Sequence, residues 1–272
     1  NPCPFGSASS SLAEGTKIMM NKFHFVFDKN LESQKLKKKF FKLYKNYKAS
    51  LSDIIIVGGG DGFMLSSLKK YVKFKKPFYG INCGTYGFLM NENTSLNLNK
   101  KIKLAKKTSI KPLEIIGSKK KIKNLIAINE VSIFRQSKQT AKISIKVGKK
   151  KIINKLTGDG VLICTPAGST AYNLSVHGPI LSLNSGKLAI TPISPFRPRR
   201  WKGKIISNKL AVEIKNLYPK KRPIAAVADN VEIRNIKNLK IRVKKNINIT
   251  LLHDPKKTLE KRIQKEKLKK RK

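Results

Sequence analysis

Apolar runs alternate with amphipathic stretches over roughly the first hundred residues. The alternation predicts the order strand, helix, strand, helix, strand over residues 23–27, 31–47, 53–57, 62–71 and 77–81. Strands and helices that alternate in this way indicate a parallel sheet with helices packed on it. We therefore predict an α/β domain over residues 20–111.

The pattern changes after residue 111 to short apolar runs separated by turn residues. These runs predict strands at 125–134, 142–147, 151–156, 160–164, 188–191, 210–214, 224–227, 239–243 and 247–252. The tripeptide Gly148-Lys149-Lys150 reads as a hairpin loop. We predict a second, β-rich domain over residues 112–254 that resembles a β-sandwich.

The two ends of the chain differ from the rest in composition. Residues 1–19 are small and mostly polar, unlike the sequence that follows, which is rich in Lys, Asn and Ile. We expect these residues to be a disordered or non-native leader without the features of a signal peptide. Residues 255–272 are strongly basic, which predicts a helix or a solvated tail.

The charge balance is strongly positive, with 60 Lys and Arg against 15 acidic residues and a net charge of +45. Such an excess is typical of nucleic-acid-binding proteins, and we keep that class as an alternative. However, only nine of the 60 are Arg, and the lysines are spread along the whole chain. This distribution favours a solvated basic surface, so we expect no specific nucleic-acid partner.

Cysteines, histidines and apolar run lengths exclude several classes of protein. Cys3, Cys83 and Cys164 are far apart, so they indicate neither a disulfide framework nor a zinc cluster, and a reducing cytoplasm fits. The three histidines are isolated and show no metal-ligand spacing, so no metal site is predicted. No apolar run approaches the roughly 18 to 20 residues that cross a bilayer, and no membrane partner is expected.

The strongest candidate for chemistry is the turn after the second predicted strand, Gly58-Gly59-Gly60-Asp61-Gly62. Glycine amides beside the start of a helix can bind phosphate oxygens, and we assign this role to Gly59 and Gly60. The turn is not a Walker loop, because no Gly-Lys-Ser/Thr follows. Asp61 is the candidate general base for an attacking hydroxyl; the competing reading is an ordinary helix cap.

Further candidates follow the third strand and lie in the second half. The loop at residues 82–87 also follows a parallel strand, so it should converge with the glycine turn on one crevice. Asn129 and Glu130 are adjacent and serve one site only at a bulge or a strand end. Residues 165–172, Thr-Pro-Ala-Gly-Ser-Thr-Ala-Tyr, combine a strand end, a turn and a helix start built from small residues.

Taken in order, these motifs resemble the NAD kinase family over about residues 21–254. The resemblance rests on Gly59-Gly60-Asp61-Gly62, on Gly80-Ile81-Asn82 with Gly84 and Gly87-Phe88-Leu89, on Asn129-Glu130, on Gly158-Asp159-Gly160 and on the 165–172 segment. The glycine turn alone also occurs in phosphofructokinases and diacylglycerol-type lipid kinases, so a lipid kinase is a second alternative.

The resemblance implies a function and a set of site residues. It implies transfer of the γ-phosphoryl group of ATP to the adenosine ribose 2′-hydroxyl of NAD⁺, with Asp61 as base, with Mg²⁺ or another divalent cation accompanying ATP, and with a Rossmann-like first domain. It also implies a homodimer or homotetramer. The implied dinucleotide-binding residues are Asp61, Gly62, Asn129, Glu130, Asp159, Ala167, Thr170, Ala171, Tyr172, Asn173, Leu174 and Ser175.

Overall fold

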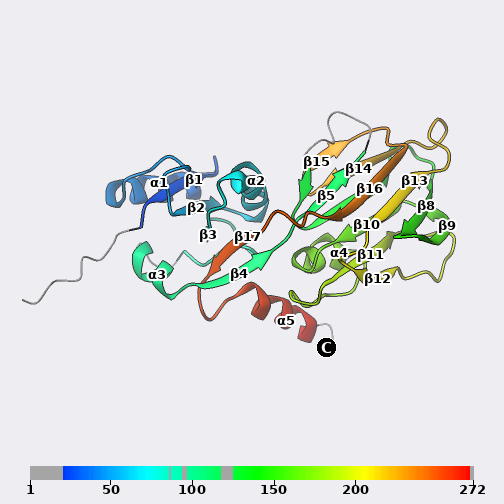
Figure 1. Cartoon of the computed structure of the whole chain (residues 1–272). Coiled ribbons are helices and arrows are strands. Elements are labelled where there is room, and N and C mark those ends of the chain that lie inside the picture. The colour runs from blue at the N-terminus through cyan, green and yellow to red at the C-terminus, as the bar shows by residue number, and fades with distance from the viewer. Residues whose placement is uncertain (1–20, 86, 94–96, 118–124, 270–272) are drawn as a thin grey trace, which may run out of the picture.

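The computed structural model describes residues 21–85, 87–93, 97–117 and 125–269. The chain forms two parts that lie side by side (Figure 1). One is a layered α/β part, and the other consists of antiparallel sheets. The predicted leader at residues 1–19 falls outside the described residues.

The first part is built on a five-stranded sheet. Its order is β1 (Phe23–Phe27), β2 (Ile54–Gly59), β3 (Phe78–Asn82), β17 (Ile249–His253) and β4 (Lys106–Ile110). Neighbouring strands from β1 to β17 run parallel, and β4 pairs antiparallel with β17. The apolar run near residue 250 predicts a strand of the second domain, but this strand instead lies inside the first sheet. Its side chains suit either sheet, and only the tertiary structure decides.

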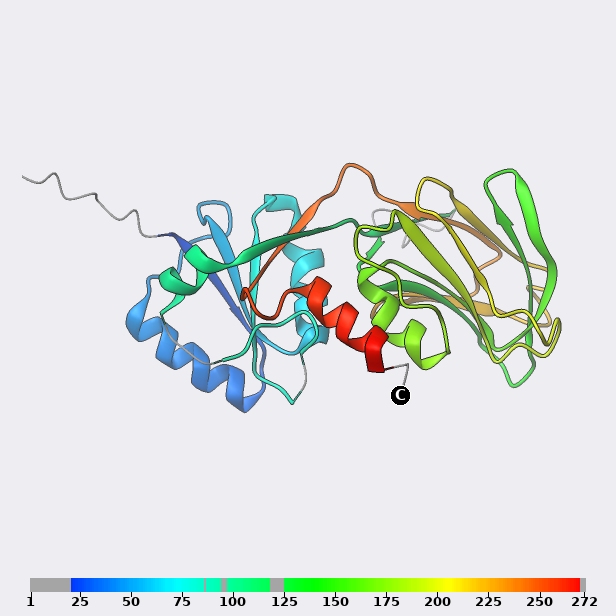
Figure 2. The ribbon, with the colours of Figure 1, turned by 90° about the horizontal axis from the view of Figure 1, so that it is seen from below.

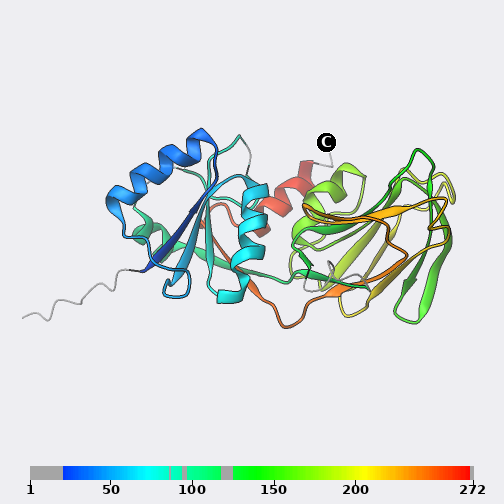
Figure 3. The same cartoon turned by 90° about the horizontal axis from the view of Figure 1, so that it is seen from above.

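Helices cover both faces of this sheet (Figure 3). The side chains of Ile54 and Ile56 pack with α1 (Leu31–Leu43) and α3 (Leu98–Leu104). Those of Ile55 and Val57 pack with α2 (Asp61–Tyr71) and α5 (Leu259–Lys269). Helix α1 ends earlier than its amphipathic pattern predicts, because Tyr44 turns extended. A short 3-10 turn, η1 (Val72–Phe74), follows α2.

The second part consists of two six-stranded antiparallel sheets. One has the order β12 (Lys204–Ser207), β11 (Lys187–Ile193), β10 (Gly160–Cys164), β7 (Glu130–Arg135), β14 (Ile224–Ala228) and β15 (Val231–Ile233). The other has the order β6 (Ile126–Ala127), β5 (Leu113–Ile116), β16 (Asn238–Val243), β13 (Val212–Asn216), β8 (Ala141–Val147) and β9 (Lys150–Gly158).

One apolar core joins these two sheets. Strand β8 buries every second residue, and its Ile143 and Ile145 share a cluster with Ile133 and Ile163 of the opposing sheet. Two sheets that bury one face each against the other form a sandwich. The predicted combination of an α/β part with a β-rich, sandwich-like part is therefore confirmed, as is the hairpin turn at Gly148, whose φ is +56°.

Helix α5 lies between the two parts (Figure 2). Leu259 and Ile263 are four residues apart, so they share one helix face, and both are buried in the cluster that lines α2. The same cluster includes Ile128 and Ala167 of the second part. Lys267 Nζ donates to Ser182 Oγ at 2.7 Å. The basic composition predicts a solvated end, but two apolar residues at helical spacing dock this segment.

No helix among the described residues combines the length and apolar character needed to cross a membrane. Cys83 and Cys164 are free thiols.

Candidate active site

The glycine turn joins strand β2 to helix α2, and its glycines differ in what surrounds them. A Cβ at Gly58 would lie 2.5 Å from the Phe27 ring, and one at Gly59 would lie 2.8 Å from the Phe63 ring, so packing requires glycine at both. A Cβ at Gly60 or Gly62 would meet nothing within 4 Å. The backbone on either side of Asp61 is therefore open to an approaching molecule.

Asp61 is the first residue of α2, and the loop after β3 holds its carboxylate. The backbone N–H of Phe88 donates to Oδ2 at 2.6 Å, and that of Leu89 donates to Oδ1 at 2.8 Å. The loops after β2 and β3 thus meet at the carboxyl edge of the parallel sheet, as predicted. Side chains at this edge are where parallel α/β sheets bind ligands.

Asn129 and Glu130 lie where β7 begins, because the predicted strand at 125–134 is divided into β6 and β7. Of the two alternatives, a bulge or a strand end, the structure has the strand end. Glu130 is only 8% exposed, and among the described residues no group hydrogen-bonds to its Oε2. Burial away from water, with a smaller effect from the Asp229 carboxylate, raises the pKa of Glu130 to about 8. This shift favours the protonated form of the Glu130 carboxyl at neutral pH, and in that form it can donate a hydrogen bond.

Asp229 is a structural residue of the site that motif reasoning missed. It occupies the turn between β14 and β15 with φ +53°, and its side chain is 1% exposed. Its carboxylate accepts from the backbone N–H groups of Ile128 and Asn129, both at 2.8 Å, and of Glu130 at 3.3 Å. Lys69 Nζ of α2 lies 3.4 Å from Oδ2. Asp229 thus fixes the start of β7 and ties it to α2.

A cleft of about 500 Å³ lies where the two parts meet. Gly62 and Phe63 line it from α2, and Glu130 and Asp229 line it from the second part. Two of the predicted residues, Gly62 and Glu130, are therefore brought together on one cleft. Asp61 immediately precedes Gly62 in the chain.

The segment after β10 forms a 3-10 turn, η3 (Ala167–Thr170), and a short helix, α4 (Tyr172–Ser175). Its backbone packs directly on the start of β7, since a Cβ at Gly168 would lie 2.3 Å from the Asn129 carbonyl oxygen. Thr165 Oγ1 donates to the Ile128 carbonyl at 2.8 Å. The predicted dinucleotide segment and the predicted Asn129-Glu130 pair therefore form one continuous surface.

Tyr172 connects this surface to Asp159. Its ring stacks on Phe134 with centroids 6.0 Å apart. Partial burial raises the pKa of the Tyr172 hydroxyl, and the carboxylates of Asp159 and Glu130 add to the effect. Asp159 in turn accepts from Arg135 Nε at 2.5 Å. Tyr172 therefore lies within electrostatic range of both predicted carboxylates.

The remaining predicted residues of the segment have different surroundings. Asn173 is fully buried. Its Nδ2 donates to the Ser169 and Pro179 carbonyls, and its Oδ1 accepts from the Thr191 hydroxyl. Such a network holds the turn in shape. Thr170, Ala171 and Leu174 are partly exposed, and Ser175 is exposed.

Comparison with known proteins decides the family. The model of the ATP-NAD kinase C-terminal domain matches residues 128–247. A protein of Zymomonas mobilis named NAD kinase is 43% identical over 253 residues, covering 92% of this chain and 98% of the relative. A NAD kinase of Brucella suis is 43% identical over 242 residues, covering 88% of this chain and 94% of the relative. The chain belongs to the NAD kinase family.

Two solved structures share the fold of this NAD kinase family member. An NAD kinase from Archaeoglobus fulgidus in complex with ATP aligns with a TM-score of 0.73 at 20% identity, covering 89% of this chain and 98% of that chain. Yeast NADH kinase complexed with NADH aligns with a TM-score of 0.66 at 24% identity, covering 80% and 66%. The resemblance read from the ordered motifs is confirmed, and a lipid kinase that shares only the glycine turn is not favoured.

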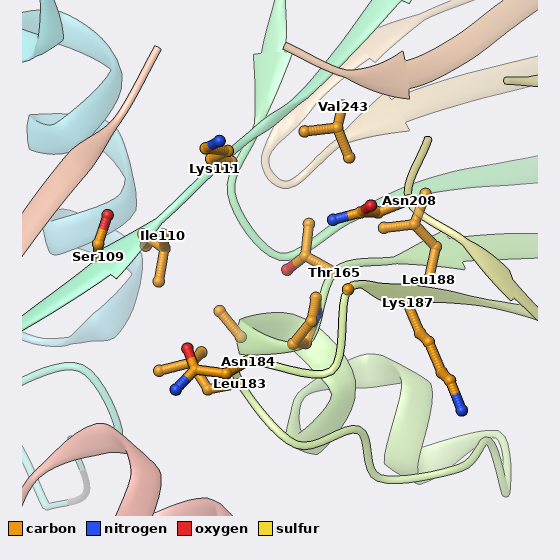
Figure 4. Close-up of a pocket in the computed structure, with 13 residues that line it drawn as sticks. Ser109, Ile110, Lys111, Thr165, Leu183, Asn184, Lys187, Leu188, Asn208 and Val243 are labelled. Atoms are coloured by element: carbon orange, nitrogen blue, oxygen red, sulfur yellow. The ribbon is translucent and has the colours of Figure 1, made fainter. Parts of the chain in front are cut away.

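A second cavity of about 260 Å³ lies beside the connection that follows β4 (Figure 4). Thr165 and Ala167 line it together with Lys111, Lys187 and Asn208. Ala167 is buried in the cluster that spans both parts. None of the described residues that line this cavity carries a carboxylate. In this respect the cavity differs from the cleft at Gly62 and Glu130.

Within the described ranges, no group of three or more His, Cys, Asp or Glu side chains is placed to hold a metal ion.

Proposed function

We propose that this chain phosphorylates NAD⁺ at the adenosine ribose 2′-hydroxyl, with ATP as donor and Asp61 as general base. The observation that carries the proposal is the position of Asp61. It begins α2 between two glycines with open space, next to a cleft that holds Glu130. The 2′-oxygen forms a bond to the γ-phosphorus while the bond to the β,γ-bridging oxygen breaks, and the hydroxyl proton passes to Asp61.

The dinucleotide occupies the surface that runs from Gly62 past Asn129 and Glu130 to residues 170–175, with Asp159 beyond Tyr172. The packing of Gly168 against Asn129 supports this, because it makes the two segments one surface. Ala167 is buried, so it contributes through packing. The protonated Glu130 donates a hydrogen bond to an acceptor of the dinucleotide. Asn173 contributes through the shape of its turn, since its amide is held by protein groups.

The open backbone at Gly60, together with the amide of Gly59, accommodates phosphate oxygens at the start of α2. A divalent cation such as Mg²⁺ arrives with ATP as part of the substrate and neutralises its phosphates. The free thiols of Cys83 and Cys164 support a cytoplasmic location.

We also propose a homodimer or homotetramer. Phe196 is 53% exposed, and Arg197 and Arg199 lie over its ring. An exposed aromatic ring flanked by arginines is typical of interfaces between proteins. Sedimentation equilibrium would give the mass, and a monomer at all concentrations would contradict the proposal.

The direct test is an assay of NADP⁺ formation from NAD⁺, ATP and Mg²⁺, with wild type and Asp61→Asn. We expect kcat to fall by about 10²-fold or more in the variant, because an amide cannot accept the proton. Asp53→Asn is the matched control, since it makes the same change at the opposite end of β2, where Asp53 accepts only from the Lys22 amide among the described residues. Near-normal turnover of Asp61→Asn would exclude its role as base.

A further inference from the structure

The docked C-terminal helix brings one arginine to the loop that holds Asp61. Leu259 and Ile263 anchor α5 in the shared core, and Arg262 lies between them in sequence on a half-buried face. Its Nη1 donates to the Gly87 carbonyl at 2.6 Å and to the Phe88 carbonyl at 2.7 Å. Its Nε donates to the Lys257 carbonyl at 3.1 Å, which fixes the direction of the guanidinium.

These two carbonyls belong to the same peptide groups that bind Asp61. The peptide that joins Gly87 to Phe88 accepts from Arg262 through its C=O and donates to Asp61 Oδ2 through its N–H. The peptide that joins Phe88 to Leu89 does the same toward Oδ1. Two consecutive peptide groups are therefore clamped between one guanidinium and one carboxylate.

Such an arrangement has a directional electrostatic effect. A cation on a peptide carbonyl polarises the peptide and strengthens the hydrogen bond that its N–H donates on the other side. The charge of Arg262 also attracts the Asp61 carboxylate over this short span, and it attracts the carboxylates of Glu92 and Asp254 as well. Burial lowers the pKa of the Arg262 guanidinium, and these three carboxylates oppose that effect. Arginine remains charged under such conditions.

We propose that Arg262 is a positioning residue for phosphoryl transfer, which orients and polarises the two amides that hold Asp61. It acts through the peptide groups of residues 87–89. The inference rests on the proposed role of Asp61. It assigns a function to a helix that lies outside the matched region of the family model, which ends at residue 247.

The experiment measures kcat, KM for NAD⁺ and the pH profile of kcat for wild type, Arg262→Ala and Lys265→Met. For Arg262→Ala we expect kcat to fall about tenfold or more while KM changes less than about threefold. We also expect the acid limb of the profile to move to higher pH, since a nearby positive charge is lost and the two backbone donors are no longer polarised by it. Ethylguanidinium added to Arg262→Ala should restore part of kcat.

Lys265→Met removes an exposed positive charge from the same helix and should leave all three quantities unchanged. A folded Arg262→Ala with wild-type kcat and pH profile would overturn the inference. Should the alanine variant unfold, the same readouts apply to Arg262→Gln, which keeps a polar side chain but no charge. If Asp61→Asn itself retained activity, the proposed role of Asp61 as base would fail instead, and if wild type formed no NADP⁺, the proposed function would fail, so these failures are distinguishable from that of Arg262.

Discussion

Asp61 and Glu130 begin two elements from different parts of the molecule, and their carboxyl groups meet opposite surroundings. Asp61 is bonded by two backbone amides that Arg262 holds in place. Glu130 is buried beside another carboxylate, and within the described chain its Oε2 has no hydrogen-bond partner. The surroundings of Asp61 therefore suit a carboxylate that accepts a proton, and those of Glu130 suit a carboxyl group that keeps one. Two carboxyl groups with different environments commonly divide the work of an active site.

Removing Asp229 tests whether the Glu130 side of this comparison depends on a buried support. In Asp229→Ala, three backbone N–H groups lose their acceptor and Lys69 loses its ion pair, although it keeps its bonds to Ala228 and Asn230. We therefore expect the free energy of unfolding to fall by about 3 kcal/mol or more. Urea denaturation measures this loss.

Asp159→Ala is the control for this loss. Its ion pair with Arg135 is more than a third exposed, and we expect a change below about 1 kcal/mol. Equal losses in the two variants would contradict the supporting role of Asp229.

The pH dependence of the folding stability should distinguish the two carboxyl groups. The Glu130 pKa is about 8 in the folded protein against an ordinary 4.5 in the unfolded chain, so the folded state binds the extra proton between these values. Stability contributed by the protonated group is therefore present at low pH and is lost as pH rises through 8. We expect wild type to lose about 3 kcal/mol more than Glu130→Gln between pH 5 and pH 8.

Thermal denaturation across that pH range measures the difference. Glu232→Gln controls for net charge, because it removes an exposed carboxylate that pairs with Arg234. Parallel stability curves for wild type and Glu130→Gln would show that Glu130 is ionised in the folded protein, and the comparison with Asp61 would lose its basis.

The features that could be predicted from the sequence are those determined by the local spacing of residues. Apolar periodicity located β1, α2 and β3, because a strand or helix that buries one face repeats its apolar residues at a fixed interval. The glycine turn located Asp61, since four glycines around one acid exceed what a helix cap needs. The alternation of side chains required a bulge or a strand end at Asn129-Glu130, but the predicted strand ran unbroken over residues 125–134, and the break between β6 and β7 was not predicted.

What the sequence could not predict depends on contacts between distant segments. Asp229 and Asn230 after an apolar run signal a turn, but the amides that Asp229 accepts from lie about a hundred residues earlier. Arg262 lies in a run of lysines, and its carbonyl partners at residues 87 and 88 are more remote still, 175 and 174 residues earlier. The docking of α5 was signalled only by Leu259 and Ile263, two apolar residues in a basic segment.

The position of β17 between β3 and β4 bears on how the chain is made. During synthesis, the first three strands leave the ribosome long before residues 249–253, yet the sheet cannot join β3 to β4 without them. The second part can be completed earlier, since its last strand ends at Val243. The usual order, in which the amino-terminal domain folds first, is therefore reversed here for the last step. Until residues 249–253 have been synthesised and pair, β3 presents an unpaired parallel edge, which is where a nascent chain is most exposed to wrong strand pairing.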